Sequence, residues 1–199
     1  MRYLLPLLLL FTATAHARTY QVDIIQSHGP REVSRQDAIG MREVMLFKFA
    51  QIGVNIRRGR VSYTKIKNPN YNLSNYEQGA LFWQKHLPPR TNIIRHVITP
   101  PFYDIGLWFI GGVSPGVCVV RWRYAVSTSN AQLVNLYGED RWWHSAIAMT
   151  HELGHVFGSK DVKDVKDASL MNIGALHFTP VQALEFSPAS ATQIHHCVG

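Results

Sequence analysis

Two histidines and a glutamate in the second half of the chain have the types and the spacing of a catalytic metal site. His151 and His155 are four residues apart, and Glu152 directly follows the first of them. Residues four apart lie on one face of an α-helix, so both imidazoles can point at one ion, and neutral imidazole is a good zinc ligand. A carboxylate beside the metal can take a proton from a metal-activated water and hand it to a leaving amine. This spacing therefore predicts metal-assisted hydrolysis with Glu152 as the base.

The residues that follow supply a turn and a third ligand. Gly158 lies three residues beyond His155, where the helix must end sharply if the chain is to return to the metal. Glycine is the residue that enters left-handed backbone conformations at low cost. Asp161 lies three residues further on, and a carboxylate oxygen is an accepted zinc ligand. We therefore expect Zn2+ to be bound by His151, His155 and Asp161.

Other assignments of the acidic residues stay open. Asp164 could replace Asp161 if the loop after Gly158 were longer, and Asp167 is interpreted as a solvated loop residue. Glu185 is the only later glutamate, but a ligand there would leave Gly158 unexplained. The stretch "DVKDVKD" lacks the glycine and the terminal glutamate of the common calcium loop.

The stretch "HELGHVFGSKD" resembles the zinc motif of the metzincin metallopeptidases, His-Glu-x-x-His-x-x-Gly-x-x-His/Asp. An aspartate in the last position makes the motif similar to that of the snapalysin-type branch of small secreted bacterial proteases. The family also has a methionine in a tight turn beneath the metal, and Met171 lies ten residues after Asp161. By this resemblance, the zinc ligands are His151, His155 and Asp161. Glu152 is then first the general base and afterwards the general acid. Met171 supports the metal site from beneath and is not a ligand.

The same resemblance implies the fold. It is α+β and metzincin-like, with a mixed twisted sheet and two long helices in an N-terminal lobe, and a small irregular C-terminal lobe below the active-site cleft. The family places an extended substrate along an edge strand, for which "GLWFIGG" (106–112) and "GVCVVRW" (116–122) are candidates. Many members carry a tyrosine after the methionine turn, but Asn172 stands here, so the oxyanion-stabilising residue is unassigned.

The elements that must position the site follow from the apolar periodicity. Strands are expected at 19–26, 54–66, from 92 up to the double proline, and at 116–127; helices are expected at 34–53, 140–158 and near 179–187. Ser34 is a plausible N-cap and Gly53 a plausible C-terminal glycine for the first helix. We expect its buried stripe to consist of Ile39, Val44, Leu46, Phe47 and Ala50.

Cysteines and the remaining histidines offer further candidates. Cys118 and Cys197 are the only cysteines, and an even count in an exported protein favours one disulfide over two free buried thiols. His144 either lines the cleft or is a polar helix position, and His177 is a candidate for contact with substrate. His195 and His196 are interpreted as a terminal polar pair rather than a second metal site.

The N-terminus predicts export. Arg2, the apolar run at 3–11 and the small residues at 15–17 are in the order of a secretory signal peptide, cleaved after Ala17. The apolar run falls short of the ~20 residues that a membrane span needs, which makes an uncleaved anchor the weaker alternative. We expect residues 18–199 to form a single catalytic domain with lobes at about 18–158 and 159–199. The protein is then secreted or periplasmic.

The length and net charge of the chain limit its domain organisation and its partners. The chain has 199 residues, 46% of them hydrophobic, and a formal net charge of +7, which suits one domain with a proper core. Its one tight basic cluster, "NIRRGR" (55–60), is interpreted as a solvated strand or turn, because no nucleic-acid module is recognisable. We expect a protein or peptide substrate, no nucleic acid, no membrane span in the mature chain, and a monomer.

The predicted function is a secreted zinc-dependent endopeptidase. Two alternatives remain: an exported binding or toxin-like protein on a metallopeptidase fold, and a zinc hydrolase of a non-protein amide. Glu152 favours an enzyme, because a descendant that only binds need not keep the base.

Overall fold

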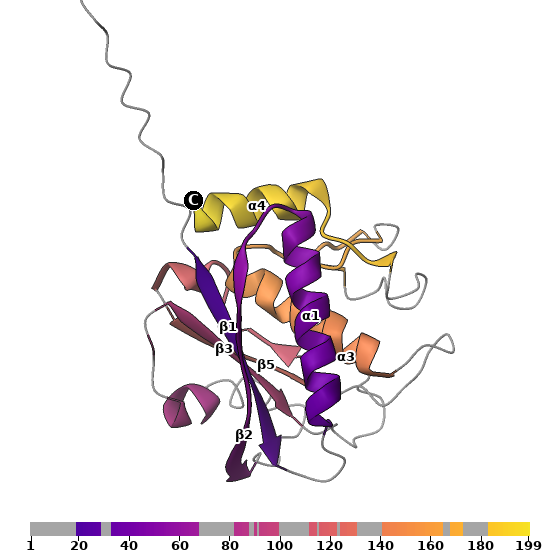
Figure 1. The fold of residues 1–199 in the computed structure, drawn as a ribbon. Helices are drawn as coiled ribbons and strands as arrows, with labels where there is room; N and C mark the ends of the chain where they lie inside the picture. Colours follow the sequence, from indigo (N-terminus) through magenta and orange to yellow (C-terminus); the bar gives the residue numbers. More distant parts are fainter. Residues whose placement is uncertain are drawn as a thin grey trace, which may run out of the picture.

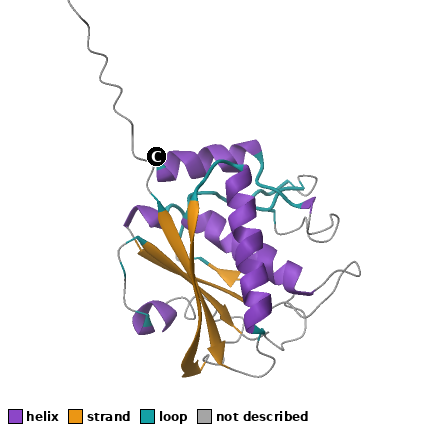
Figure 2. Ribbon diagram, viewed as in Figure 1, coloured by secondary structure: helices purple, strands orange, loops and turns teal. Residues whose placement is uncertain are grey.

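Two long helices lie against a twisted sheet, with a third helix across one end (Figures 1 and 2). The computed structural model describes residues 19–28, 33–67, 82–87, 90, 92–99, 112–114, 116–122, 124–130, 141–164, 168–172 and 183–199. The helices are α1 (Arg35–Gln51), α3 (Arg141–Val156) and α4 (Pro188–Val198). The strands are β1 (Tyr20–His28), β2 (Ile56–Lys67), β3 (Ile93–Thr99), β4 (Gly112–Val113) and β5 (Tyr124–Asn130). The predicted signal peptide lies outside these ranges.

The sheet has five strands in the order β2-β1-β3-β5-β4. β1 pairs in parallel with both β2 and β3, and β3 pairs in parallel with β5. The short strand β4 runs antiparallel to β5 and ends the sheet on that side. The predicted α+β class, with a mixed sheet and two long helices, is confirmed. None of the helices in the described ranges combines the length and apolar content that a bilayer crossing requires.

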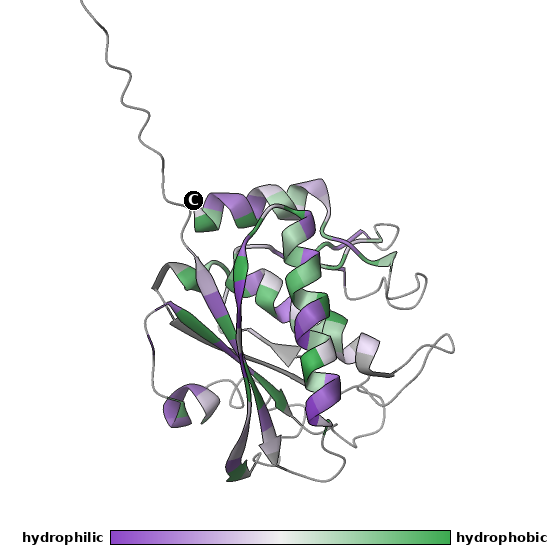
Figure 3. Ribbon diagram, viewed as in Figure 1, coloured by the Kyte–Doolittle hydropathy of each residue, from purple (hydrophilic) through white to green (hydrophobic). Residues whose placement is uncertain are grey.

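The main core lies between the sheet and the helices α1 and α3. Val22 and Ile24 of β1 face this core, while Ile25 faces a smaller cluster with Trp83 from the short helical segment 82–86. β1 and β3 thus carry apolar residues on both faces of the sheet, and Figure 3 shows apolar and polar stretches along the strands. Phe49 links α1 to the end of α3, because its ring centroid lies 5.0 Å from that of Phe157. α3 is thereby fixed against both the sheet and α1.

Helix α1 has the predicted ends but a different buried face. Ser34 is its N-cap and accepts a hydrogen bond from the backbone N–H of Asp37, and Gly53 follows the helix with φ +74°. The expected stripe is correct at Val44 but wrong at Phe47, which is 60% exposed, and at Ala50, which is also exposed. The residues that α1 buries are Ala38, Met41, Val44, Met45, Lys48 and Phe49. The buried face is set by contact with α3 and the sheet, which places Met41 and Met45 inward.

Two predicted elements are displaced. Residues 116–118 form a turn and Val119–Trp122 a 3-10 helix, so the strand expected at 116–127 begins only at Tyr124. Cys118 has φ +62° and its N–H donates to the carbonyl of His155, which removes it from the sheet. The helix expected near 179–187 is also wrong over its described part, because Glu185 pairs with Ser169 in an isolated β-bridge. The helix starts after Ser187, which caps α4.

Candidate metal centre and active site

Helix α3 carries core residues on one face and residues of the candidate site on another. Met149, Leu153 and Val156 are fully buried in the main core. His151 and His155 lie one turn apart on another face, and their rings meet edge-on with centroids 4.7 Å apart. The helical spacing thus brings both imidazoles to one place, as expected from their separation of four residues.

Two backbone carbonyls orient the histidine rings. His151 Nδ1 lies 3.0 Å from the carbonyl oxygen of Leu170, and His155 Nδ1 lies 2.8 Å from that of Ser159. A carbonyl can only accept, so each Nδ1 carries the proton and donates it. In a neutral ring, Nε2 is then left with a lone pair that points into the site, whereas a protonated His151 donates from Nε2 to Asp161. The neutral form is the arrangement typical of metal-binding histidines, whose other ring nitrogen is held by an outer partner.

Asp161 completes a triangle of possible ligand atoms. The two Nε2 atoms are 3.2 Å apart, and Asp161 Oδ1 lies 3.3 Å from each of them. Ligands about 2.0–2.1 Å from a tetrahedral zinc ion are about 3.3 Å from one another, so the triangle matches one face of such a site. Within the described ranges, no other group of histidine, cysteine and carboxylate side chains is brought together in this way. The three residues therefore fit zinc.

The charges of the site favour a cation. Burial alone would lower the pKa of His151, but the hydrogen bond to Asp161 and the charge of Glu152 outweigh it and raise the pKa above its ordinary value. Burial and the neighbouring His151 lower the pKa of His155. The hydrogen bond from His151 lowers the pKa of Asp161, so its carboxylate stays ionised. Lone pairs and a negative charge converge on one point, where a proton and a metal ion compete.

Glu152 lies beside this triangle and is not part of it. Its residue is 7% exposed, and burial raises the pKa of its carboxyl to about 7, although the charge of His151 opposes the shift. The backbone N–H of Ser114, directly after β4, donates to the carboxylate. A cation at the nitrogens would lower this pKa again. Glu152 is thus a partly shielded carboxyl between the histidines and the edge strand, with the pKa range of a general base.

Gly158 turns the chain back towards the site. It has φ +119°, and a Cβ added there would lie 2.6 Å from Cys197 Cβ. Both the backbone conformation and the close approach of α4 therefore require glycine. Cys197 forms the predicted disulfide with Cys118. The turn after α3 is held between the C-terminal helix and the segment 116–118.

A tight turn that contains Met171 packs against α3 next to His151. The N–H of Asn172 donates to the carbonyl of Ser169 over 2.9 Å, which closes the turn. Met171 is fully buried, and a Cβ added to Gly154 would lie 2.5 Å from its sulfur. The methionine therefore packs against α3 at the residue just before His155, where a larger side chain would push it away. The same turn presents the Leu170 carbonyl to His151.

The alternative ligands are not part of the triangle. Asp164 and Glu185 lie outside the group formed by His151, His155 and Asp161. Glu185 Oε1 instead accepts a hydrogen bond from Gln51 Nε2 at 3.0 Å. His195 Nε2 donates to the carbonyl of Ile52 at 2.6 Å, a link from α4 to the end of α1.

Several candidates cannot be placed. His177, Asp167 and most of the stretch 106–112 lie outside the described residues, as does the side chain of His144. Of the two edge-strand candidates, residues 116–122 are not a strand. Among the described strands, the sheet ends in β2 on one side and in β4 on the other, and β4 shares only Gly112 with the other candidate.

Sequence reasoning missed the groups that form hydrogen bonds to the site residues and to the loop that carries Asp161. They are the carbonyls of Ser159 and Leu170, the N–H of Ser114, and the side chains of Asn172 and Gln193. Every residue has a backbone carbonyl, and nearly every residue has an N–H, so residue type does not indicate which of them contact the site. Asn172 and Gln193 are ordinary polar residues whose partners are set only by the folding of distant segments.

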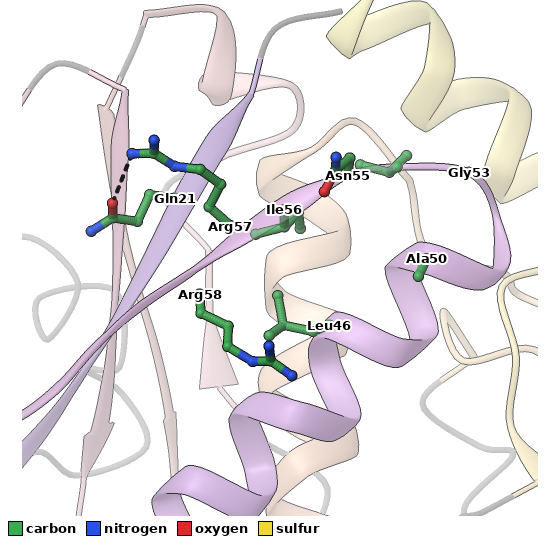
Figure 4. A pocket seen from close by; sticks show the side chains of 9 residues that line it. Gln21, Leu46, Ala50, Gly53, Asn55, Ile56, Arg57 and Arg58 are labelled. Atoms are coloured by element: carbon green, nitrogen blue, oxygen red, sulfur yellow. Dashed lines mark hydrogen bonds between the residues drawn. The ribbon is translucent and has the colours of Figure 1, made fainter.

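A shallow pocket lies apart from the metal triangle, between α1 and the start of β2 (Figure 4). Leu46 and Ile56 contribute apolar surface, and Arg57 and Arg58 lie beside it. Arg57 donates to Gln21 Oε1 at 3.2 Å, and Arg58 forms an ion pair with Glu43 at 2.8 Å. The basic cluster at 55–60 is therefore a solvated strand, as predicted, and the guanidinium groups of Arg57 and Arg58 bind neighbouring side chains.

Comparison with known proteins identifies the fold. The sequence matches no described protein family and no curated protein. Metalloproteinase-II from Bacteroides fragilis matches the structure with a TM-score of 0.61 and 16% identity, over 94% of this chain and 55% of that one. Archaemetzincin from Methanopyrus kandleri matches with a TM-score of 0.60 and 17% identity, over 89% of this chain and 94% of that one. The fold is metzincin-like.

A third structure agrees. Archaemetzincin from Archaeoglobus fulgidus, solved with malonate, matches with a TM-score of 0.50 and 17% identity, over 87% of this chain and 99% of that one. The chain spans little more than half the length of the Bacteroides protein, with 55% of it covered, but nearly the full length of both archaemetzincins. At these identities the likeness establishes the fold. The resemblance to the snapalysin-type branch stays a prediction.

Proposed function

We propose that this protein is an exported zinc-dependent endopeptidase. The observation that carries the proposal is the triangle of His151, His155 and Asp161, whose edges of 3.2 and 3.3 Å fit tetrahedral zinc, with Glu152 beside it. The metzincin-like fold supports it, because the solved structures that share this fold include metallopeptidases. Met171 would act as the structural floor under the metal.

The side chains have separate roles in this mechanism. Bound zinc would supply Lewis acidity, which polarises a peptide carbonyl and makes water a stronger nucleophile near neutral pH. Glu152 takes a proton from the attacking water and delivers it to the leaving amine. The N–H of Ser114 holds the carboxylate in position, and burial raises the pKa of this carboxyl in the metal-free protein, which favours proton uptake. The carbonyls of Leu170 and Ser159 keep both imidazole rings aimed at the metal.

The outer edge of β4, which pairs with no other strand of the described residues, is the proposed platform for the substrate. β4 is the last strand of the sheet and leads directly to Ser114, next to Glu152. An extended peptide can add to such an edge through backbone hydrogen bonds, which places its carbonyls at regular spacing. A peptide bond would then lie beside Glu152. This geometry favours cleavage within a chain over removal of single terminal residues.

Two features of the chain support export. The first 17 residues have the order of a signal peptide, and the disulfide between Cys118 and Cys197 is of a kind that persists in oxidising compartments. We propose cleavage after Ala17 and a secreted or periplasmic mature protein. N-terminal sequencing of the exported protein tests this, and a mature N-terminus at Met1 would contradict it.

Glu152→Gln tests the proposed chemistry. The change keeps the size of the side chain but removes its ability to accept a proton. General base catalysis is worth about 10²–10⁴-fold, so we expect a loss of that order in kcat/KM on a mixed peptide library. Zinc stoichiometry should stay at one ion per chain in both proteins. Equal activity in wild type and variant would contradict the mechanism, and zinc binding without any peptidase activity would favour a binding protein.

A further inference from the structure

The loop that carries Asp161 is attached to a helix far along the chain. The backbone N–H of Lys160, one residue before the ligand, donates to Gln193 Oε1 of α4 at 2.9 Å. We propose that Gln193 is a positioning residue that holds Asp161 in place for zinc. This inference rests on the proposed zinc site. Gln193 does not reach the metal, and it acts through the backbone that precedes the aspartate.

Asp161 needs such support more than the histidines do. His151 and His155 belong to a regular helix, whereas Asp161 lies in a segment without helix or strand and its side chain is 46% exposed. A ligand atom must be held within roughly 0.5 Å of its productive position. A segment without its own repeating hydrogen bonds gains that precision only from contacts with its surroundings.

Helix α4 is a firm support for this contact. Ser187 caps its start by accepting the N–H of Ser190, and Cys197 near its end is tied to Cys118 by the disulfide. Ile194, the residue after Gln193, is fully buried in the main core. Gln193 itself is exposed, so the core does not need its side chain. An exposed side chain can be changed with little effect on the fold, while the hydrogen bond that it makes to the loop is lost.

The loop residues after Asp161 form hydrogen bonds with the turn that contains Met171. The N–H of Val162 donates to the carbonyl of Met171 at 2.9 Å, and Asn172 Nδ2 donates to the carbonyl of Asp164 at 2.7 Å. Asp161 is thus bracketed by two anchors, one on α4 and one on the Met171 turn. Ser159 is fixed to α3, because its N–H donates to the carbonyl of Gly154 at 2.9 Å and its own carbonyl accepts from His155. Loss of the α4 anchor should therefore free only Lys160 and Asp161, which shifts the carboxylate away from the triangle.

Gln193→Leu is the decisive variant, because leucine has a similar size but no acceptor. We expect its zinc affinity, measured by competition with a chromogenic chelator, to fall about 10-fold, the lower end of what outer-shell changes cost. The absorption spectrum of the Co2+-substituted protein should change, because the geometry of the third ligand changes. The melting temperature of the metal-free protein should stay that of wild type. Gln193→Glu keeps an oxygen acceptor and should restore the wild-type spectrum.

Thr192→Ala is the matched control on the same helix. Its hydroxyl donates only within α4, to the carbonyl of Pro188 at 2.9 Å, so we expect wild-type zinc affinity. Wild-type affinity in Gln193→Leu would overturn the positioning role and leave the zinc site intact. Equal losses in both variants, or a matching fall in the melting temperature of the metal-free protein, would also overturn it. A wild-type protein that binds no zinc would overturn the proposed function itself.

Discussion

His151 and His155 lie on a buried helix with regular backbone hydrogen bonds, whereas Asp161 lies on a loop and its side chain is 46% exposed. The helix places two ligands with its own geometry, because residues four apart always share a face. The loop has no such repeat and takes its position from Gln193, Met171 and the turn at Gly158. One half of the site is therefore local in origin, and the other half depends on tertiary contacts.

Removal of a helix ligand should have the largest effect. His155→Ala deletes a nitrogen that lies 3.2 Å from His151 Nε2 and 3.3 Å from Asp161, and no neighbouring side chain of the group can replace it. We expect zinc affinity to fall by more than the ~100-fold that outer-shell changes can cost. Isothermal titration of the metal-free protein with zinc measures it. A variant that still binds with wild-type affinity would move the site elsewhere.

Removal of the loop ligand should cost less. Asp161→Ala leaves both histidines in place, and water can reach the vacated position because the side chain is half exposed. We expect a clear loss of zinc affinity that is smaller than that of His155→Ala. Asp164→Ala is the matched control, since this residue lies outside the triangle and should bind zinc as wild type does. A larger loss for Asp164→Ala would assign the third ligand to that residue.

Gly158→Ala tests the joint between helix and loop. Alanine at φ +119° is strained, and its Cβ would lie 2.6 Å from Cys197 Cβ. Backbone strain and overpacking each cost about 1–3 kcal/mol, so we expect a loss of about 3 kcal/mol in the free energy of unfolding. Urea denaturation measures this. Gly40→Ala, within the regular helix α1, is the comparison and should be neutral or stabilising.

The disulfide between Cys118 and Cys197 also stabilises the connection between α3 and the loop that carries Asp161. Cys118→Ser with Cys197→Ser should lower the free energy of unfolding by about 2–4 kcal/mol, since the bond closes a long loop. We also expect the loop half of the site to loosen, because Cys197 packs against Gly158. Zinc affinity in the double variant should fall, whereas the helix content by circular dichroism should not. Unchanged stability would show that the helix packing suffices without the bond.

The side-chain pKa values of the two histidines should differ measurably. In the metal-free protein, Asp161 and Glu152 raise the pKa of His151 against the effect of burial, and burial with His151 lowers the pKa of His155. The raised pKa of His151 stabilises the folded state below pH 6.5, and this contribution is lost as the pH rises through the folded value. NMR titration should therefore show the pKa of His151 above 6.5 and that of His155 below it.

Asp161→Asn sharpens this prediction. The amide removes the charge of the loop ligand, so burial should prevail and lower the pKa of His151. The pKa of His155 should change less, because its largest causes are burial and His151. An unchanged pKa of His151 would show that the loop does not approach the helix in solution.

Much of the fold followed from local patterns, and the failures have one cause. Helix α1, helix α3 and strands β1 to β3 lie close to their predicted ranges, because each has a clear period and clear ends. The predictions at 116–127 and near 179–187 are wrong where the chain meets a distant partner. Cys118 turns to meet Cys197 and His155, and Glu185 extends to pair with Ser169. Local periodicity carries no information on such pairs.

The sequence by itself determined the chemistry available to this protein. Two histidines one helical turn apart, with a glutamate between them, share a helix face whatever the rest of the chain does. Only the tertiary structure decided that Asp161, and not Asp164, reaches the two nitrogens. Three acidic residues at equal spacing look alike in sequence, and they differ only in the contacts of the backbone that carries them. Gln193 and the Met171 turn hold that backbone, and both come from parts of the chain that meet the loop only after folding.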